Sequence, residues 1–394
     1  MACAGVHRLS GDPLLAEHWC ARLAAAVAPG GCGCRVLLLL AGTETAAVSG
    51  ISAAGATPAS RRRTAAADAE LLLLGPAQPR PHALPPLPAG VSPALISRVV
   101  VEELALAPLV VDLGAPLAPT VPHLHLGQGP ARCLSSGAAL APDRVARLLA
   151  LGRRWGERLA VRGAPVLLAE CVPGGTSTAQ AVLEGLGVPA AGLVSGSLRR
   201  PAHQLKARLV RSGLAAAGLH PPAPAAAVLA AVGDPMQVVA AGLVQAAGAA
   251  GLPLLLAGGS QMAAVLALAL ELTPPPLRPR LLAQAAVATT AWVAGERGSD
   301  LSSLLAAIAQ RWGQAPLAFA AGLRFVDCLS PELRDYERGY VKEGVGAGGL
   351  ALLWELSGRS SSALAIACDQ ACMLLRSQAQ AFDASEFNAS EPAV

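Results

Sequence analysis

Short runs of apolar residues recur along the chain, and most of them end in small residues. The runs do not alternate with polar residues, which is the pattern of strands buried on both faces of a parallel sheet. The runs with this character are Val36–Ala41, Leu71–Leu74, Leu109–Val111, Val166–Ala169, Leu252–Ala257 and Ala286–Val293. The sequence therefore predicts a sheet built largely from parallel strands.

Segments with the helical spacing of apolar residues lie between these runs. They are Pro93–Leu106, Pro142–Leu159, Ser177–Leu186, Ala202–Ala217, Met236–Ala249, Gln261–Leu270 and Leu301–Trp312. Strands that alternate with helices indicate a doubly wound α/β fold, with a mostly parallel sheet and helices on both faces. Ligands of such folds bind in the loops that follow the carboxyl ends of the strands.

The two ends of the chain depart from this alternation. Pro13–Val27 has the spacing of a short amphipathic helix, and Ser360–Ala381 has that of a long one. Pro76–Pro93 is rich in proline and predicts an irregular surface loop. We therefore expect an N-terminal helical segment over residues 1–34, an α/β domain over 35–357, and a C-terminal helix with a tail frayed after Phe382 over 358–394. The terminal segments would form a small helical subdomain.

Composition narrows the classes of partner. The net charge is +4, and the compact basic run Arg61-Arg62-Arg63 has no aromatic platform, so no nucleic-acid partner is expected. The uncharged stretch Pro235–Leu270 has the length of a membrane span, but Pro253 and Gly258-Gly259 interrupt it, so no membrane partner is expected. The nine cysteines are irregularly placed, which suits a reducing cytoplasm.

The cysteines and histidines of the chain do not form a complete metal-binding motif. Cys32-Gly33-Cys34 has neither a second CxxC motif nor a His pair to complete a site. His123 and His125 would share one face of a strand, but Pro122 and Gly127 favour a loop there. No metal and no cofactor is therefore expected.

Lysine is rare: of the 30 lysines and arginines, two are lysine, Lys206 and Lys342. A lysine that remains in so arginine-biased a chain is a candidate for a tight position that the planar guanidinium cannot occupy. For either lysine alone, chance survival is an equally good explanation. Both tyrosines, Tyr336 and Tyr340, lie beside Lys342. This cluster directly precedes Glu343, so the segment is a candidate site.

Two loops join a predicted strand to a predicted helix through paired glycines. The first carries Gly174, Gly175, Thr176 and Ser177 after Glu170, and the second carries Gly258, Gly259 and Ser260. Glycines let a ligand approach the backbone closely, and the N–H groups at a helix start, capped here by Thr176 or Ser177, favour an anion. Neither loop is a Walker A or GxGxxG motif. Together they predict a cradle for a phosphorylated ligand, whereas each alone is equally an ordinary tight turn.

A third turn starts at Glu343 and contains Gly344 and Gly346. A Glu among glycines has little side-chain cover of its own, so the residues or substrate packed over it determine its environment. Desolvation would raise the pKa of such a carboxyl and suit it to act as a general base. The alternative is a glycine-rich connection with a solvated Glu.

Taken together, these loops resemble the nicotinate-nucleotide:dimethylbenzimidazole phosphoribosyltransferase family of cobamide synthesis, in a branch that departs from its better-known members. The Glu170 and Glu343 loops, in that order and spacing, are the specific part of the resemblance. Supporting stretches are Ala41–Thr45, Gly50–Gly55, Lys206, Gly233–Gln237 and Gly258–Ser260. The resemblance covers residues 35–357, makes that part a phosphoribosyltransferase-like domain, and implies a homodimer.

The family moves ribose 5-phosphate from nicotinate mononucleotide to a nitrogen of a benzimidazole, which releases nicotinate and inverts the anomeric carbon. The resemblance implies that Glu343 is the general base and Glu170 a second acid. It implies that a 5-phosphate binds to Gly174, Gly175, Thr176, Gly258, Gly259 and Lys206, with Ser177, Ser260, Lys342, Gly344 and Gly346 in or beside the site.

Three departures leave the acceptor base open. Where better-known members carry an Asp-His pair, a Gly-Asn-Thr-Thr loop and an Asp-Gly-Phe turn, this chain has Thr43-Glu44-Thr45, Gly175–Thr178 and Ala257-Gly258-Gly259. A purine such as adenine is an alternative to dimethylbenzimidazole. A non-catalytic mononucleotide-binding or regulatory protein is a second hypothesis. A dinucleotide-dependent oxidoreductase is a third, against which the missing GxGxxG motif argues.

Overall fold

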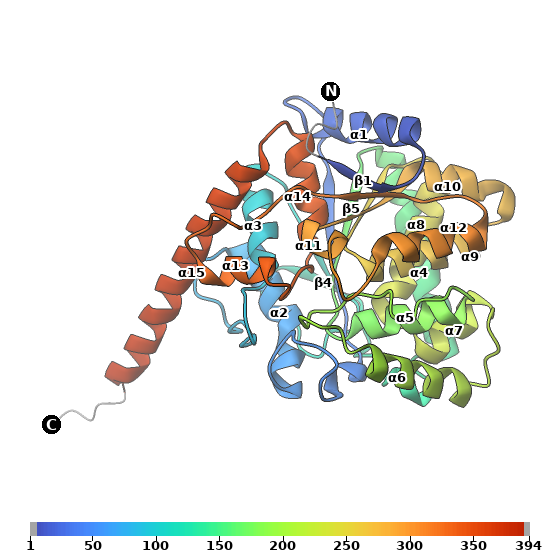
Figure 1. Ribbon diagram of the computed structural model, residues 1–394, viewed down its shortest axis with the longest axis horizontal. Coiled ribbons are helices and arrows are strands. Elements are labelled where there is room, and N and C mark those ends of the chain that lie inside the picture. The colour runs from blue at the N-terminus through green and yellow to red at the C-terminus, as the bar shows by residue number, and fades with distance from the viewer. Residues whose placement is uncertain (1–5, 390–394) are drawn as a thin grey trace.

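The computed structural model describes residues 6–389, with side chains to residue 378, and its centre is one eight-stranded sheet (Figure 1). The strand order is β1-β8-β7-β6-β5-β2-β3-β4. The strands are β1 His7–Ser10, β2 Arg35–Leu40, β3 Leu109–Asp112, β4 His123–His125, β5 Val166–Cys171, β6 Leu254–Ala257, β7 Ala285–Thr289 and β8 Leu317–Ala320. All neighbours are parallel except β1, which pairs antiparallel with β8.

Helices cover both faces of this sheet. They are α1 Pro13–Val27, α2 Pro58–Leu74, α3 Ala94–Glu103, α4 Pro142–Arg162, α5 Gly175–Gly185, α6 His203–Ala216, α7 Ala225–Val232, α8 Pro235–Ala249, α9 Ser260–Leu272, α10 Arg278–Gln284, α11 Ala291–Ala294, α12 Leu301–Trp312, α13 Pro331–Glu337, α14 Ala347–Leu356 and α15 Ser361–Ala389. Short 3₁₀ turns are η1 Glu44–Ala47, η2 Leu134–Ser136 and η3 Pro275–Leu277.

Successive strand residues enter two separate cores, because side chains alternate across a sheet. In β2, Leu37 and Leu39 pack with α4, α5, α8 and α9, whereas Leu38 and Leu40 pack with α1, α2, α3 and α14. The predicted doubly wound α/β fold is therefore confirmed, and the continuous apolar runs are explained by burial on both faces.

The structure corrects several predicted elements. Leu71–Leu74 is the end of helix α2, not a strand, because α2 is buried on most sides and a short apolar run there lacks a distinguishing period. The segment around His123 and His125 is the edge strand β4, not a loop, since an edge position tolerates the preceding proline. Strand β7 ends at Thr289, where Thr290 caps the short α11, so Ala286–Val293 is only partly a strand.

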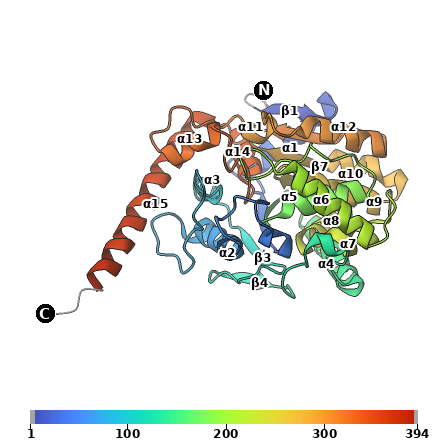
Figure 2. The ribbon, with the colours of Figure 1, turned by 60° about the horizontal axis from the view of Figure 1, so that its bottom comes forward.

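The terminal segments also differ in detail from the expectation. The N-terminal segment contributes β1 to the sheet edge as well as α1. Helix α15 packs beside α14 and then extends beyond the rest of the chain (Figures 1 and 2), and it continues to Ala389, past the expected frayed point at Phe382. The remainder of the predicted tail, 390–394, lies outside the described residues, and the division into three domains stays a prediction.

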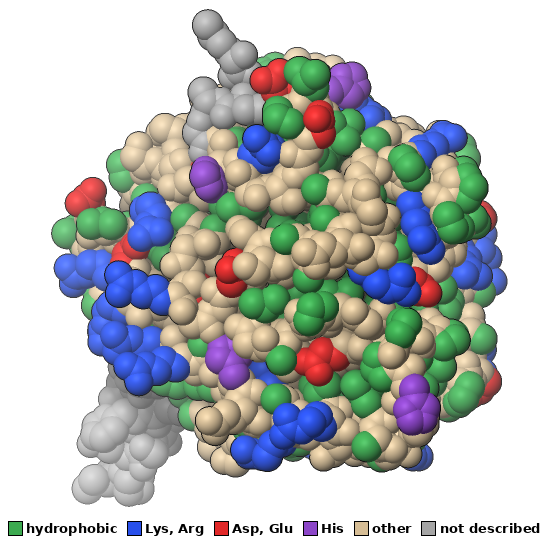
Figure 3. Space-filling model, turned by 45° about the vertical axis from the view of Figure 1, so that its right-hand side comes forward, with side chains coloured by type: hydrophobic (Ala, Val, Ile, Leu, Met, Phe, Trp, Pro, Cys, Tyr) green, Lys and Arg blue, Asp and Glu red, His purple; other side chains and the backbone are tan. Residues whose placement is uncertain are grey.

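The distribution of surface charge and the length of the helices relate to two expectations, that the protein has no nucleic-acid partner and no membrane partner. Basic and acidic side chains are interspersed over the face shown in Figure 3. Within residues 6–389, no helix is both long and apolar enough to span a membrane. The uncharged stretch Pro235–Leu270 does not form one continuous helix, because α8, β6 and α9 follow one another through it.

Candidate active site

A cavity of about 240 Å³ opens at the carboxyl ends of β5 and β6, where a doubly wound sheet binds its ligands. Its floor comes from the loops that follow these two strands and from the turn before α14. One wall is a proline-rich segment, Leu84–Pro93, together with one face of α2. Another part of the lining is the segment Ser195–Ser197 with Lys342. The cavity therefore joins all three loops that the sequence singles out.

Glu343 lies at the floor of the cavity with both carboxyl oxygens engaged. Oε1 accepts hydrogen bonds from the backbone N–H groups of Gly344 and Gly348, each 3.1 Å away. Oε2 accepts from Thr289 Oγ1 and from the backbone N–H of Thr290, each 3.0 Å away. Desolvation by burial nevertheless raises the pKa of Glu343, while these donors oppose the rise. The environment thus orients the carboxyl and increases its basicity.

The absence of a side chain at Gly348 allows this arrangement. A Cβ atom there would lie 2.2 Å from the carbonyl carbon of Thr289 and 2.5 Å from Glu343 Oε2. The backbone of α14 can therefore approach the end of β7 only with glycine at this position. The predicted glycine-rich turn is the means by which a helix start closes around Glu343.

Glu170 lies at the end of β5, close to Glu343. Its Oε2 accepts from the backbone N–H of Val172 at 3.0 Å, and Oε1 accepts from Gln261 Nε2 at 2.8 Å. Burial, followed by repulsion from Asp234 and Glu343, raises the pKa of Glu170 to about 8. In the empty cavity at neutral pH, Glu170 is therefore mainly a neutral acid. A cationic group bound beside it would return it to the carboxylate form.

The first glycine loop starts α5 differently from the prediction. The N-cap is Gly174 in the left-handed conformation (φ 81°), and neither Thr176 nor Ser177 caps the helix. Thr176 Oγ1 instead accepts a hydrogen bond from Lys206 Nζ at 2.9 Å. The reason is that a left-handed N-cap favours glycine, which leaves the Thr176 hydroxyl free for another partner.

Lys206 stands one layer behind the cavity wall. Its Nζ donates to the backbone oxygen of Ser195 at 2.6 Å as well as to Thr176, and both of these residues line the cavity. Desolvation lowers the pKa of Lys206 to about 7, although Glu296 acts against the shift. The lysine therefore places an ionisable positive charge directly behind the hydroxyl of Thr176.

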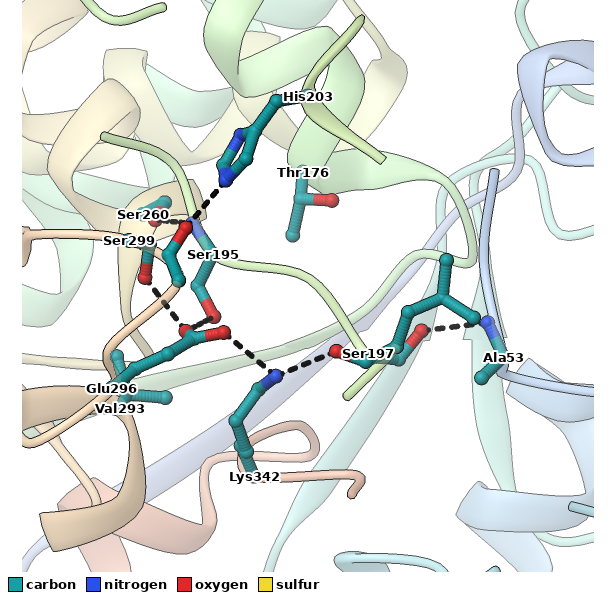
Figure 4. Close-up of polar contacts among 12 residues, drawn as sticks. Ala53, Thr176, Ser195, Ser197, His203, Ser260, Val293, Glu296, Ser299 and Lys342 are labelled. Carbon is teal, nitrogen blue, oxygen red and sulfur yellow. Dashed lines mark hydrogen bonds and ion pairs between the residues drawn. The ribbon is translucent and has the colours of Figure 1, made fainter. Parts of the chain in front are cut away.

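Lys342 lines the cavity itself and forms a buried ion pair (Figure 4). Its Nζ lies 2.8 Å from Glu296 Oε1 and donates to the backbone oxygen of Leu198 at 2.7 Å. Glu296 Oε2 also accepts from Ser195 Oγ at 2.5 Å and from Ser299 Oγ at 2.6 Å. The pair ties the turn before Glu343 to the segment that holds Ser195. Sequence reasoning missed Glu296, because nothing near it forms a motif.

The structure brings most predicted site residues together, but not all. Those that line the cavity are Glu170, Gly174, Gly175, Thr176, Gly259, Ser260, Lys342, Glu343 and Gly344. Those beside it, but not on its surface, are Ser177, Lys206, Gly258 and Gly346. Ser177 is completely buried, and Gly346 packs its backbone against Ala169, so both support the loops from behind.

The proline-rich segment is the largest part of the cavity that the sequence did not suggest. We expected Pro76–Pro93 to be a surface loop, but its second half lines the cavity with Leu84, Pro85, Leu87 and Pro88. Tyr336 holds this wall in place, because its hydroxyl donates to the backbone oxygen of Val91 at 2.8 Å. A contact across so much of the chain leaves no local sequence signal.

Among the described residues, one cluster has the side chains of a metal site. Atoms of Asp112, His123 and His125 lie within 4.8 Å of one another at the β3–β4 edge. Asp112 already bonds His125 Nδ1 at 2.7 Å and two backbone N–H groups, and none of the three residues lines the cavity. The cluster is accounted for by the pairing of an edge strand.

Comparison with known proteins gives matches to a family model and to relatives of similar length. The DBI_PRT phosphoribosyltransferase family model matches residues 97–285. A UPF0284 protein of Parasynechococcus marenigrum is 54% identical over 344 residues, which covers 85% of this chain and 86% of the relative. A UPF0284 protein of Gloeobacter violaceus is 48% identical over 362 residues, which covers 91% of each.

Solved structures show the same fold. CobT from Thermus thermophilus superposes with a TM-score of 0.56 at 22% identity, over 90% of each chain. A second structure from that organism, a nicotinate-nucleotide-dimethylbenzimidazole phosphoribosyltransferase, gives a TM-score of 0.55 at 20% identity, over 91% of this chain and 96% of the other. The chain therefore belongs to the UPF0284 family, and its residues 97–285 match the phosphoribosyltransferase family model.

Proposed function

We propose that this protein transfers ribose 5-phosphate from nicotinate mononucleotide to a nitrogen of a benzimidazole or purine, forming an α-riboside phosphate for a cobamide lower ligand. The observation that carries the proposal is a buried, hydrogen-bonded carboxyl, Glu343, at the floor of a cavity that also holds Glu170. The coarser activity, phosphoribosyl transfer, is supported by the family model that matches residues 97–285.

Two parts of the cavity lining suit the two ends of such substrates. Thr176, backed by Lys206, and Ser260 lie at the start of α5 and α9, where hydroxyls, backbone N–H groups and a cation favour a phosphate. Another part of the lining is Leu84–Pro93, whose apolar side chains favour a flat heterocycle. Glu343 and Glu170 lie on the floor, where the ribose would join the two.

In the proposed reaction, a ring nitrogen of the acceptor base attacks the anomeric carbon. The bond from that carbon to the nicotinate nitrogen breaks, and its electron pair stays on the released nicotinate. The second ring nitrogen of the acceptor becomes acidic as the new bond forms, and Glu343 takes its proton. Glu170 faces the cationic nicotinate ring of the donor and stabilises positive charge on the ribose. Attack opposite to the leaving group gives the α-anomer.

A non-catalytic binding protein is supported only by the altered Thr43-Glu44-Thr45 and Ala257-Gly258-Gly259 positions. Thr43 and Thr45 do not line the cavity: Thr43 Oγ1 contacts Thr45 Oγ1 at 3.0 Å, and Thr45 Oγ1 accepts from Leu134 N–H at 3.0 Å. These residues serve the η1 turn. The departure at Thr43-Glu44-Thr45 therefore lies away from the proposed base and acid, which supports the transferase over the binding protein.

The first test is a product assay with the whole chain. The protein is incubated with nicotinate mononucleotide and, separately, with adenine, dimethylbenzimidazole or no base, and the products are read by mass spectrometry. We expect nicotinate release that depends on an added base, together with a base-riboside phosphate of the same stoichiometry. Mononucleotide binding without product for either base would instead support the binding-protein hypothesis.

The proposed phosphate site predicts a pH dependence of donor binding. Because the pKa of Lys206 is lowered to about 7, the lysine is charged below that pH and loses its charge as the pH rises above it. Affinity for nicotinate mononucleotide should therefore fall by up to ~10-fold per pH unit above pH 7, where the phosphate itself is already fully ionised. Deprotonation of Glu170, whose pKa is about 8, instead favours the cationic nicotinate ring and partly opposes this fall.

Calorimetric titrations between pH 6.5 and about 8 in wild type and in Lys206→Met measure this effect. The methionine variant has a side chain of similar length that cannot ionise. It should bind the donor more weakly at pH 6.5 and lose most of the slope. The same affinity and the same slope in both proteins would remove Lys206 from the phosphate site.

A further inference from the structure

One carboxyl in the cavity has no part in the reaction described above. Asp68 lies on α2 and lines the cavity, but its side chain is buried and 4% exposed. Its Oδ1 accepts from Ser92 Oγ at 2.6 Å, and its Oδ2 accepts from Cys171 Sγ at 3.3 Å. Both donors are neutral, and no Lys, Arg or His within the described part of the chain forms an ion pair with it. Asp68 therefore presents negative charge to the cavity.

Asp68 lies on the heterocycle side of the cavity. Thr64, one turn earlier on α2, lines the same wall, and so do Ser92 and Pro93 of the proline-rich segment. Pro93 in turn touches the turn of the proposed base, since a Cβ atom on Gly344 would lie 2.9 Å from Pro93 Cγ. A continuous wall thus runs from Glu343 across Pro93 and Ser92 to Asp68. A flat base whose reacting edge faces Glu343 would turn its far edge toward Asp68.

We infer that Asp68 selects acceptor bases that carry an N–H donor on the edge away from Glu343, such as aminopurines, over bases with an apolar edge. This inference rests on the proposed function. A carboxylate only accepts hydrogen bonds, and its two oxygens retain lone pairs after bonding Ser92 and Cys171. An exocyclic amine of the base would donate hydrogen bonds to these lone pairs. The methyl groups of dimethylbenzimidazole would instead cover Asp68, removing water without replacing its hydrogen bonds.

Adenine and unsubstituted purine form a matched pair, because they differ only in the exocyclic amine. With wild-type protein and nicotinate mononucleotide, we expect kcat/KM for adenine to exceed that for purine by at least ~10²-fold, as for sites built to bond a donor. Dimethylbenzimidazole should be the poorest acceptor of the three. In Asp68→Ala the adenine advantage should collapse, and dimethylbenzimidazole should improve relative to adenine.

Asp68→Asn and Ser92→Ala serve as companion variants. The amide oxygen of Asn still accepts from an amine, so its adenine preference should lie between those of wild type and Asp68→Ala. Ser92→Ala keeps the carboxylate and should keep most of the preference. Each variant is checked by thermal unfolding, and Asp68→Asn carries the test if Asp68→Ala does not fold. An equal loss of activity toward adenine and purine in both Asp68 variants would make Asp68 merely structural and overturn the inference.

Base binding separates this inference from the proposed reaction. Calorimetry of adenine and purine with the whole chain reads the same preference without any transfer. A wild-type preference for adenine that disappears in Asp68→Ala supports the inference even if no nicotinate is released, in which case only the proposed reaction fails. Equal affinities for adenine and purine in wild type overturn the inference, whether or not transfer occurs.

Discussion

Glu343→Gln is expected to lower the rate of nicotinate release by a factor of ~10²–10⁴, the usual loss when a general base is removed. Glutamine has nearly the same shape but cannot take the proton of the acceptor. All four donors around Glu343 point at its carboxyl oxygens, so the new amide NH₂ group must also face donors. Some loss of stability is therefore expected, on the order of 1–3 kcal/mol.

A pH profile separates the two effects of this variant. The pKa of Glu343 is raised by desolvation, so the wild-type turnover should fall as the pH decreases through that raised value, where the base becomes protonated. In Glu343→Gln this acidic limb should be absent, while donor binding persists. Turnover equal to that of wild type would contradict the assignment of Glu343 as the general base. A reduced rate with the acidic limb retained would give Glu343 a structural role only.

Thr289→Ala is the matched control for position 343. It removes the Thr289 hydroxyl that donates to Oε2 but leaves the carboxyl and its backbone donors in place. We expect a much smaller loss of turnover than in Glu343→Gln, and an acidic limb that remains. A loss as large as that of Glu343→Gln would show that turnover depends mainly on the orientation of the Glu343 carboxyl and not on its basicity.

Local patterns predicted the elements and loops that depend on local chemistry. Helix α1 has the expected bounds, Pro13–Val27, because Asp12 caps it and proline suits its first turn. Strands β2 and β5 follow from their uninterrupted apolar runs. The loops after β5 and β6 meet as expected, since parallel strands end at the same edge.

The cavity wall and the polar network could not be predicted in the same way, because contacts between distant segments create them. In the sequence Tyr336 is only one of two tyrosines beside Lys342, yet in the structure its hydroxyl donates to the backbone oxygen of Val91, and its ring packs against Trp292 and Phe325. Asp68 carries no local signal at all. Its meaning depends on Cys171 and Ser92, which reach it from a strand and a loop.

The rarity of lysine was informative but did not distinguish the roles of the two lysines. Lys342 lines the cavity, whereas Lys206 lies behind its wall. Lys342 also has a left-handed backbone (φ 71°), and both lysines are almost completely buried. A guanidinium has five N–H groups to satisfy, and neither position offers that many acceptors, which explains why arginine does not replace lysine there.

Lys342→Met is expected to destabilise the substrate-free protein by ~3–5 kcal/mol, the usual cost of leaving one partner of a buried ion pair alone. The side chains of Lys342 and Glu296 are 2% and 5% exposed, so solvent screens this pair little. Lys206 is close enough to Glu296 to interact with its charge, which places the loss near the lower end of that range. Denaturant unfolding of the whole chain measures it.

The double variant Lys342→Met/Glu296→Gln decides whether the pair is coupled through charge. Removing both charges leaves the new glutamine side chain with the hydroxyls of Ser195 and Ser299 as partners, so most of the loss should be recovered. The exposed pair of Arg359 and Glu103, whose side chains are 39% and 53% exposed, is the matched control, and Arg359→Met should cost less than ~1 kcal/mol. If the double variant were no more stable than Lys342→Met, the lysine would stabilise the turn before Glu343 through packing and its bond to Leu198, not through Glu296.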